Sequence, residues 1–450
     1  MTAQDERQRS AVRQVGSTAV VKVVVMGVAG LAGIATSRLI IEHYGVDAFA
    51  QYGLLTGLTG LMPFADLGVA AVIVNAVASA AQPRTDREVR RTITSAFRIL
   101  LVSATVIATV AVVIGALGWW PALLGDGLMG ERGATAATVC LLVFALALPL
   151  GVGQRVLVAL GRNAQQTALG GIASPLVLCG VAGSVALAWA FGPFVAVFSY
   201  VANAAVAFVS LVLAARLLSP QVTAAARDVP RLRSVPGAKV VDVAWPMLVQ
   251  MVALPIAMQT DRLLLSHLAG AGELAEYNLG AQTFGLINQV VGAAGVALWP
   301  VYARARAAGR IESPARASVA FAGLAAALGL LLWLALPLVT QVITKGKIEM
   351  TTALAASFFL FVVVQGAKYP LGMYMTDARG LRFQVVPIVV MVPLNLGLSW
   401  ALIGPLDAAG PILGSALAVM VCQVVPNAWY VRRDLARRRD AGAEPTPQIG

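Results

Sequence analysis

Long apolar runs separated by short polar loops fill the chain from one end to the other. A helix rises 1.5 Å per residue, so about 20 apolar residues are needed to cross the hydrocarbon core of a bilayer. Twelve runs are long enough, and each predicts a membrane-spanning helix. In the first half they cover about 15–40, 50–81, 93–117, 135–159, 167–190 and 194–217. In the second half they cover about 241–266, 276–302, 316–340, 352–376, 385–404 and 410–431.

The composition agrees with a helical membrane protein. Hydrophobic residues make up 59% of the chain and charged residues 12%, whereas soluble domains carry roughly 25% charged residues. The mean hydropathy is +0.81, and no water-soluble packing could hide so much apolar surface. A membrane β-barrel would instead show segments of about ten residues with alternating polarity. We therefore expect an all-α integral membrane protein.

Basic residues gather on alternate loops and predict the orientation. The net charge is +12, which in a soluble protein would suggest nucleic acid as a partner. Here it follows the rule that positively charged loops stay in the cytoplasm, so we expect no nucleic acid partner. The arginine-rich side holds both termini, which places them in the cytoplasm and the protein in the cell membrane. The opposite loops hold little beyond Arg132, Lys345 and Lys347.

The longest polar stretch divides the chain into two lobes. Residues 218–240 contain three prolines with scattered arginines and predict a cytoplasmic linker. It joins a six-helix lobe at 1–217 to a six-helix lobe at 241–431. Residues 432–450 form a basic cytoplasmic tail, which we expect to be disordered against anionic headgroups. Because each lobe has an even number of spans, a two-fold axis along the membrane normal should relate the two around a central cavity.

A short motif occurs once in each lobe. In both copies an Arg ends an apolar run, three aliphatic residues follow, and a His lies five residues after the Arg. A Tyr follows the Arg after 14 residues in the first copy and after 15 in the second. Arg38 and Arg262 are 224 residues apart in a chain of 450. The motif therefore indicates a duplication, in which His43 and His267 are interpreted as residues at headgroup level.

Charged residues inside spans are the main functional signal, because each costs about 2.5–3.5 kcal/mol at a helix centre and usually lines an interior cavity. Arg38 and Arg262 lie near the outer ends of the first and seventh spans. They could snorkel to the headgroups or place one cation per lobe in the cavity, and their matched positions favour the cavity. Lys22 and Lys368 lie in the cytoplasmic halves of the first and tenth spans, and the same two roles are open to them.

Acidic and amide side chains add further candidates. Asp66, in the second span, could serve ion coupling, pair with a cation of the first span, or cap a broken helix. Asp261 could pair across the cavity or bind a coupling ion. Asn278 and Gln282, in the eighth span, are candidate substrate contacts. Such polar residues suit either contacts between helices or a path lined for sugars.

No catalytic signature is present in the sequence. A Walker A loop is missing, and no His/Cys cluster has the spacing of metal ligands. We expect a protein that is not an enzyme and that uses neither a cofactor nor a bound metal.

Several short motifs resemble a known family. In the first half they are Arg38 with its aliphatic residues, Tyr44-Gly45, Tyr52-Gly53 and the run from Phe64 to Gly68. In the second half they are Asp261-Arg262, the run from Tyr277 to Leu279, Asn395-Leu396 and the run from Gly410 to Ala416. At these positions the chain resembles the Wzx-type polysaccharide flippases of the MOP superfamily (multidrug/oligosaccharidyl-lipid/polysaccharide exporters).

This resemblance implies twelve helices in two lobes and a cavity that opens alternately to each side of the membrane. It implies that an undecaprenyl-diphosphate-linked oligosaccharide moves from the cytoplasmic to the outer leaflet. Membrane lipids and a polysaccharide polymerase or export machinery are the implied partners. The diphosphate would need fixed cations, and arginine binds phosphate in bidentate fashion. We expect Lys22 and Lys368, then Arg38 and Arg262, to hand it across.

Three alternatives remain open. A cation-coupled drug or metabolite antiporter of the same fold would be expected to bury several acidic residues in one lobe. A glycan polymerase or ligase would need a long polar outer loop, and none of the predicted outer loops is long. A scaffold without transport would not need duplicated charge inside the membrane.

Overall fold

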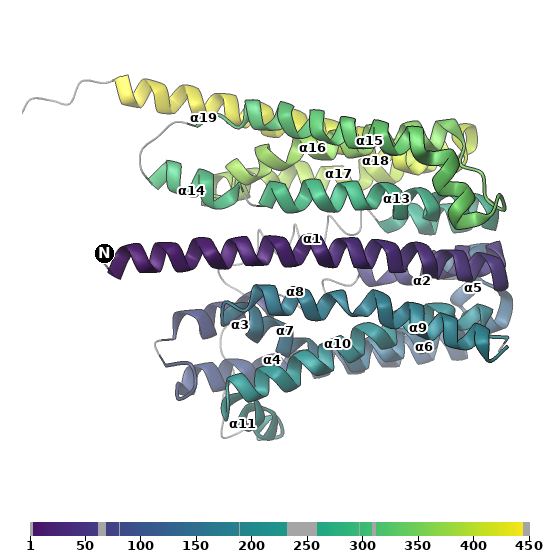
Figure 1. Ribbon diagram of the computed structural model, residues 1–450, viewed down its shortest axis with the longest axis horizontal. Helices are drawn as coiled ribbons and strands as arrows, with labels where there is room; N and C mark the ends of the chain where they lie inside the picture. Colours follow the sequence, from purple (N-terminus) through teal and green to yellow (C-terminus); the bar gives the residue numbers. More distant parts are fainter. Residues whose placement is uncertain are drawn as a thin grey trace, which may run out of the picture. The chain divides into compact units, whose positions relative to one another are not determined.

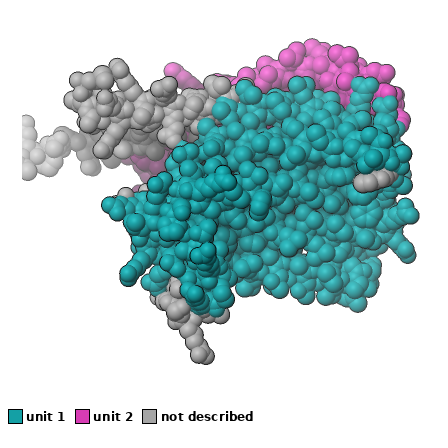
Figure 2. Space-filling model, turned by 60° about the horizontal axis from the view of Figure 1, so that its bottom comes forward, with its two compact units in different colours: residues 1–248 teal, residues 249–450 magenta. Residues whose placement is uncertain are grey.

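The computed structural model describes residues 3–61, 69–80, 82–188, 190–231, 259–296, 298–307 and 312–443. All regular elements in these ranges are helices, which confirms the all-α class. The chain forms two compact units, residues 1–248 and 249–450 (Figure 2), and each is described by itself.

The first unit is built on one long helix, α1 (Ala3–His43), beside which α8 (Asn163–Gly171) and α9 (Ala173–Ala186) pack (Figure 1). Two of its longer helices are uninterrupted, α4 (Arg87–Ala116) and α10 (Val195–Leu217). The others are α2 (Val46–Leu58), α3 (Val69–Ser79), α5 (Trp120–Leu124), α6 (Gly130–Ala147), α7 (Val152–Ala159) and α11 (Gln221–Asp228). Short 3₁₀ turns link several of them, at Thr59–Leu61, Gly125–Gly127, Pro149–Gly151 and Gly192–Phe194.

The second unit begins, in its described part, with helical residues 259–268. Its labelled helices are α13 (Ala271–Val296), α14 (Trp299–Ala307), α15 (Ala315–Thr344), α16 (Thr352–Tyr374), α17 (Ala378–Leu406), α18 (Ala409–Val419) and α19 (Val425–Ala443). A π-helical turn, Met420–Val424, joins α18 to α19. The α15 and α16 pair and the α17 and α18 pair each pack side by side.

Nine helical stretches in the described part of the chain are long and apolar enough to cross a membrane. They match nine of the twelve predicted spans. The predicted span 50–81 includes residues 62–68, and the span 241–266 starts with 241–258; both stretches lie outside the described residues. The predicted span 276–302 is occupied by α13 and the start of α14. The protein is thus a multi-pass membrane protein.

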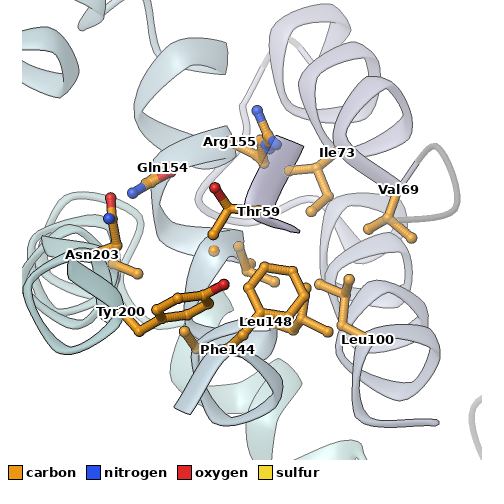
Figure 3. Close-up of a pocket in the computed structure, with 14 residues that line it drawn as sticks. Thr59, Val69, Ile73, Leu100, Phe144, Leu148, Gln154, Arg155, Tyr200 and Asn203 are labelled. Atoms are coloured by element: carbon orange, nitrogen blue, oxygen red, sulfur yellow. The ribbon is translucent and has the colours of Figure 1, made fainter. Parts of the chain in front are cut away.

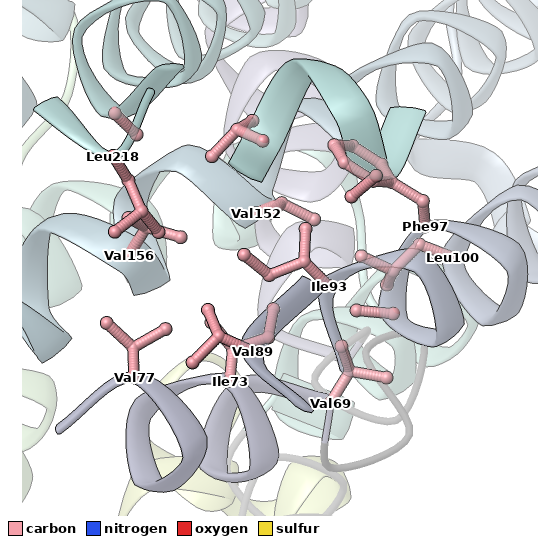
Figure 4. Packing of buried hydrophobic residues seen from close by; sticks show 14 residues of the cluster. Val69, Ile73, Val77, Val89, Ile93, Phe97, Leu100, Val152, Val156 and Leu218 are labelled. Carbon is pink, nitrogen blue, oxygen red and sulfur yellow. The ribbon is translucent and has the colours of Figure 1, made fainter. Parts of the chain in front are cut away.

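Close backbone contacts hold the first unit together. At Gly153 of α7, a Cβ atom would lie 2.3 Å from backbone atoms of Leu211 in α10. Only glycine permits such an approach, and small residues are what let membrane helices pack tightly. Beside this contact, a cluster of buried hydrophobic side chains joins α3, α4, α7, α10 and α11 (Figure 4), among them Ile73, Ile93 and Val156.

The prediction that the chain is disordered after Val431 is wrong for residues 432–443, which continue α19. The Tyr374 hydroxyl donates to Asp434 Oδ2 at 2.7 Å, and Arg438 Nε donates to the same oxygen at 2.7 Å. These bonds pair the charged groups of Asp434 and Arg438, and they hold the helix against α16.

Part of the predicted linker 218–240 is also folded. Residues 221–228 form α11, which packs against α4. The carboxylate of Asp228 is buried and accepts from Arg90 Nε at 2.6 Å. Residues 232–258 lie outside the described part of the chain.

Candidate functional site

A buried carboxylate forms the centre of a polar cluster in the second unit. Asp261 is 1% exposed. Ser415 Oγ donates to its Oδ2 at 2.8 Å, Ser399 Oγ to its Oδ1 at 3.1 Å, and the Tyr277 hydroxyl to Oδ2 at 3.2 Å. A buried carboxylate is tolerated only when donors surround it. Four helical segments therefore meet at this side chain.

Next to it, Arg262 is held in a fixed orientation. Its Nε donates to Asn278 Oδ1 at 2.9 Å, and its Nη1 donates to Gln259 Oε1 at 2.7 Å. The guanidinium carbon lies 5.7 Å from the centre of the Tyr277 ring, at a distance typical of a cation–π contact. Its Nη2 has no hydrogen-bond partner among the described residues. One edge of the guanidinium is thus oriented by protein groups while the other remains available to a ligand.

A cavity of about 190 Å³ adjoins both side chains. Phe284 and Phe358 stack on one another in its wall, with ring centres 5.6 Å apart. Two amide oxygens in the lining, Asn288 Oδ1 and Gln365 Oε1, are buried and have no hydrogen-bond partner among the described residues. Buried polar atoms normally have partners. These oxygens therefore indicate a cavity that receives a donor or a cation.

The first unit repeats this framework of tyrosine and serine hydroxyls, but it has no acidic residue at the position of Asp261. Ser37 stands at the position of Asp261. Nearby, the Tyr52 hydroxyl lies 3.1 Å from Ser199 Oγ, and the Tyr44 hydroxyl donates to Ser184 Oγ at 2.9 Å. Ser184 and Ser199 precede Ser399 and Ser415 by 215 and 216 residues, which extends the duplication beyond the motif.

The matched arginine of the first unit has a different environment. The Arg38 side chain is 45% exposed, and its Nε lies 3.8 Å from Glu42 Oε2 one helical turn away. The residues that correspond to Gln259 and Asn278 are Ala35 and Gly53, neither of which has a side-chain acceptor. Arg38 is therefore not oriented as Arg262 is.

The remaining predicted residues are each described within their own unit, or lie outside the described residues. Lys22 is exposed on α1. Lys368 lies on α16, with its Nζ 5.2 Å from the centre of the Tyr369 ring. Gln282 is half-buried on α13. Asp66 lies outside the described residues.

A second cavity, of about 290 Å³, lies in the first unit between α3, α6, α7 and α10 (Figure 3). Its wall is mostly apolar, and the rings of Phe144 and Tyr200 lie next to each other in it. Its polar lining residues are Thr59, Gln154, Arg155, Tyr200 and Asn203. Arg155 was not among the predicted site residues. Its charge within the predicted span 135–159 was the signal that could have identified it.

Comparison with known proteins identifies the family and the fold of the chain. The profile of the polysaccharide biosynthesis protein family matches residues 11–306. Among solved structures, an inward-facing multidrug resistance MATE family transporter of the MOP superfamily is similar with a TM-score of 0.75 at 16% identity, over 94% of this chain and 100% of that one. The lipid II flippase MurJ, in an inward closed conformation, is similar with a TM-score of 0.65 at 11% identity, over 93% and 90%.

A MOP superfamily transporter from Pyrococcus furiosus is also similar, with a TM-score of 0.56 at 15% identity over 95% of this chain and 96% of that one. No curated protein sequence matches significantly. The fold and the family expected from the sequence are thereby confirmed. The chain belongs to the polysaccharide biosynthesis protein family and has the fold of the MOP superfamily.

Proposed function

We propose that the protein is a flippase. It moves an oligosaccharide linked to undecaprenyl diphosphate from the cytoplasmic to the outer leaflet of the cell membrane by alternating access. The family description, polysaccharide biosynthesis, supports glycan chemistry, and a lipid II flippase shares the fold. In this proposal both termini are cytoplasmic, residues 1–217 and 241–431 are the two lobes, and the transport cycle involves no covalent catalysis.

The main support for this proposal is that hydrogen bonds hold the guanidinium of Arg262 in a fixed orientation. A charged side chain within a membrane span is costly and is usually functional. Gln259 and Asn278 hold two N–H groups of this side chain, so the cation is positioned before a ligand arrives. Arginine can bind phosphate with two parallel hydrogen bonds. We assign Arg262 as the main contact to the diphosphate, with Asn278 as its positioning residue.

The remaining candidates take secondary roles. Arg38, Lys22 and Lys368 complete a cationic path for the diphosphate, and Gln282 contacts the cargo beside Asn278. In the first lobe, Arg155 and Asn203 are exposed within predicted spans and line the 290 Å³ cavity. Polar groups at such positions avoid lipid and face water-filled paths. They therefore support a hydrated route through which sugars could pass.

Proteoliposomes that contain a fluorescent undecaprenyl-diphosphate-linked oligosaccharide test this proposal. The label on outer-leaflet cargo is quenched with a reagent that cannot cross the membrane, and flipping is followed as the approach to full quenching. Arg262→Gln should slow flipping at least tenfold, because charge-assisted hydrogen bonds are worth about 1.5–3 kcal/mol. Arg132→Gln, which removes the same charge from an exposed position in the first turn of α6, is the control. Flipping at the wild-type rate by Arg262→Gln would refute the assigned contact.

A cation-coupled antiporter of drugs or metabolites is the second candidate. It is favoured by the cavity that adjoins Asp261, where Asn288 and Gln365 each present an unpartnered amide oxygen, and by the similarity to a MATE transporter. Here Asp261 would bind the coupling ion, and Asp66 is the further candidate. Uptake of a fluorescent cationic drug, driven by a sodium or proton gradient in vesicles without lipid-linked sugar, would support the antiporter over the flippase.

A further inference from the structure

A groove at one end of the first unit has no role in the proposed transport path. Its volume is about 480 Å³. It lies where three connections meet: the segment between α3 and α4, the turn between α7 and α8, and the end of α10. The residues that line it are Gln82, Pro83, Arg84, Thr85, Leu160, Arg162, Leu217 and Leu218.

Two arginines give the groove its charge. Arg84 Nε donates to the carbonyl oxygen of Leu217 at 3.1 Å, and Arg162 Nη1 donates to Gln165 Oε1 at 3.1 Å. The other N–H groups of these two guanidiniums have no hydrogen-bond partner among the described residues. None of the described residues that line the groove is an aspartate or a glutamate. The groove therefore has an excess of strong donors and a net positive charge, which suits an anion.

The rest of the lining is aliphatic. Leu160, Leu217, Leu218 and Pro83 supply apolar surface within the same groove. A small soluble anion would gain nothing from this surface, whereas a phosphate attached to a hydrocarbon chain would use both parts. The ligand that fits is amphipathic, with an acidic headgroup.

Hydrogen bonds within the protein also fix the shape of the groove without a ligand. Gln221 Nε2 of α11 donates to the backbone carbonyl oxygens of Arg84 at 2.9 Å and Asp86 at 3.1 Å. Asp86 caps the first turn of α4 by accepting from the N–H of Glu88 at 2.7 Å. The segment that carries Arg84 is thus fixed on both sides, so binding need not order it.

We propose that this groove binds the headgroup of an anionic phospholipid from the cytoplasmic leaflet. Arg84 and Arg162 donate to its phosphate oxygens, while the leucines contact the start of its acyl chains. The groove lies at the ends of predicted spans on the arginine-rich side, where headgroups lie, and basic pockets at this level bind acidic lipids. A phospholipid suits the site better than the cargo diphosphate, whose assigned contact, Arg262, lies within a span.

Native mass spectrometry of the detergent-purified full-length protein tests this proposal. Phosphatidylglycerol and phosphatidylcholine with identical chains are titrated separately. Both lipids carry the phosphate that the arginines contact, but phosphatidylcholine also carries a quaternary ammonium beside it. The expected result is saturable binding of phosphatidylglycerol, at least tenfold tighter than that of phosphatidylcholine, because the two guanidiniums repel this ammonium. Arg162→Gln should abolish the preference, and so should Arg84→Gln. The only side-chain hydrogen bond that Arg162 makes among the described residues is to Gln165 in α8, so Arg162→Gln keeps the test valid should Arg84→Gln misfold.

Arg132→Gln, which removes one charge from an exposed position in the first turn of α6, should keep the preference. Equal affinity for the two lipids, or an unchanged preference in Arg162→Gln, would overturn the proposal. Displacement of phosphatidylglycerol by inorganic pyrophosphate, but not by orthophosphate, would also overturn it and would indicate a diphosphate site. Arg262→Gln should retain phosphatidylglycerol binding while flipping is lost, which separates this inference from the proposed function.

Discussion

Ser415 Oγ lies 2.8 Å from Asp261 Oδ2, although 154 residues separate the two along the chain. This bond ties α18 to the helical segment 259–268, and Ser399 of α17 adds a second donor at 3.1 Å. In the first unit the Oγ atom of the corresponding Ser199 has only the Tyr52 hydroxyl, at 3.1 Å, as a hydrogen-bond partner among the described residues. The duplicated framework thus carries a buried acid in one lobe and a neutral hydroxyl pair in the other.

Removing the Ser415 hydroxyl should destabilise the protein more than removing its counterpart. Ser415→Ala leaves the buried Asp261 carboxylate one donor short, which costs about 1–3 kcal/mol. Ser199→Ala, the control, breaks a bond between two neutral groups and should cost about 0.5–1.5 kcal/mol. Unfolding in detergent, followed by tryptophan fluorescence, compares the two. Equal losses would show that the acid does not depend on this donor.

Replacing Asn278 by leucine should weaken cargo binding without removing a charge. The Asn278→Leu substitution deletes the acceptor of Arg262 Nε, so the guanidinium keeps its charge but loses its orientation. We expect the KM for the lipid-linked oligosaccharide to rise about tenfold with a smaller change in the maximal rate, since one oriented hydrogen bond to a charged group is worth about 1.5–3 kcal/mol. Flipping rates across a range of cargo densities in proteoliposomes give both quantities.

Gln289→Leu is the matched control, because Gln289 is an exposed amide on the same helix, α13. It should leave the KM unchanged. An Asn278→Leu variant with wild-type kinetics would mean that Arg262 is positioned by other groups.

The spans could be predicted from the sequence because a bilayer imposes one length on every apolar helix. Their interruptions could not be located as well. The predicted span 135–159 is broken into α6 and α7 by a 3₁₀ turn at Pro149–Gly151, where proline removes a backbone donor and clashes with the preceding turn. Hydropathy does not register such a break, since proline and glycine there are flanked by apolar residues.

The candidate site was predictable only in part. Asp261 and Arg262 were found because charge within a span is rare. Ser399 and Ser415 could not be assigned to Asp261, because serines are common in apolar helices and these two come from distant parts of the chain. The sequence could have predicted that only Arg262, and not Arg38, is oriented by side-chain acceptors. The repeat aligns Ala35 and Gly53 with Gln259 and Asn278, so the acceptors were missing in the first copy.

Replacing Arg90 should destabilise the protein more than replacing Asp228, its partner in an ion pair. The Asp228 side chain is 4% exposed and that of Arg90 is 41% exposed, with Arg90 Nη2 2.5 Å from Asp228 Oδ2. Arg90→Ala leaves a buried carboxylate undercompensated and should cost about 3 kcal/mol. Asp228→Asn leaves an arginine that water can reach and should cost less, about 1 kcal/mol.

Arg231→Gln serves as the control for this pair. Arg231 is also an ion-pair partner of Asp228, but it is 66% exposed and its Nη1 lies 3.4 Å from Oδ1. Exposed pairs contribute little, so no measurable loss is expected. Denaturation in mixed detergent micelles ranks the three variants. If Asp228→Asn proves the most damaging, the carboxylate has a role beyond this pair.

Gly414 determines how closely α18 approaches α17, and through this the geometry at Asp261. A Cβ atom at Gly414 would lie 2.8 Å from Ser399 N and 3.0 Å from Ser399 Oγ. Gly414→Ala must therefore move the helix that carries the Ser399 hydroxyl, and overpacking of this kind costs about 1–3 kcal/mol. Thermal unfolding in detergent measures the loss.

Gly404 on α17 provides the contrast, since a Cβ atom there would meet nothing within 4 Å. Gly404→Ala should leave stability unchanged or raise it by about 0.5–1 kcal/mol, because alanine costs less backbone entropy than glycine in a helix. A combined Gly414→Ala and Ser399→Ala variant should lose less than the sum of its two single variants, since the first substitution already displaces the hydroxyl that the second removes. Additive losses would instead show that α17 adjusts to the methyl group without moving Ser399 from Asp261.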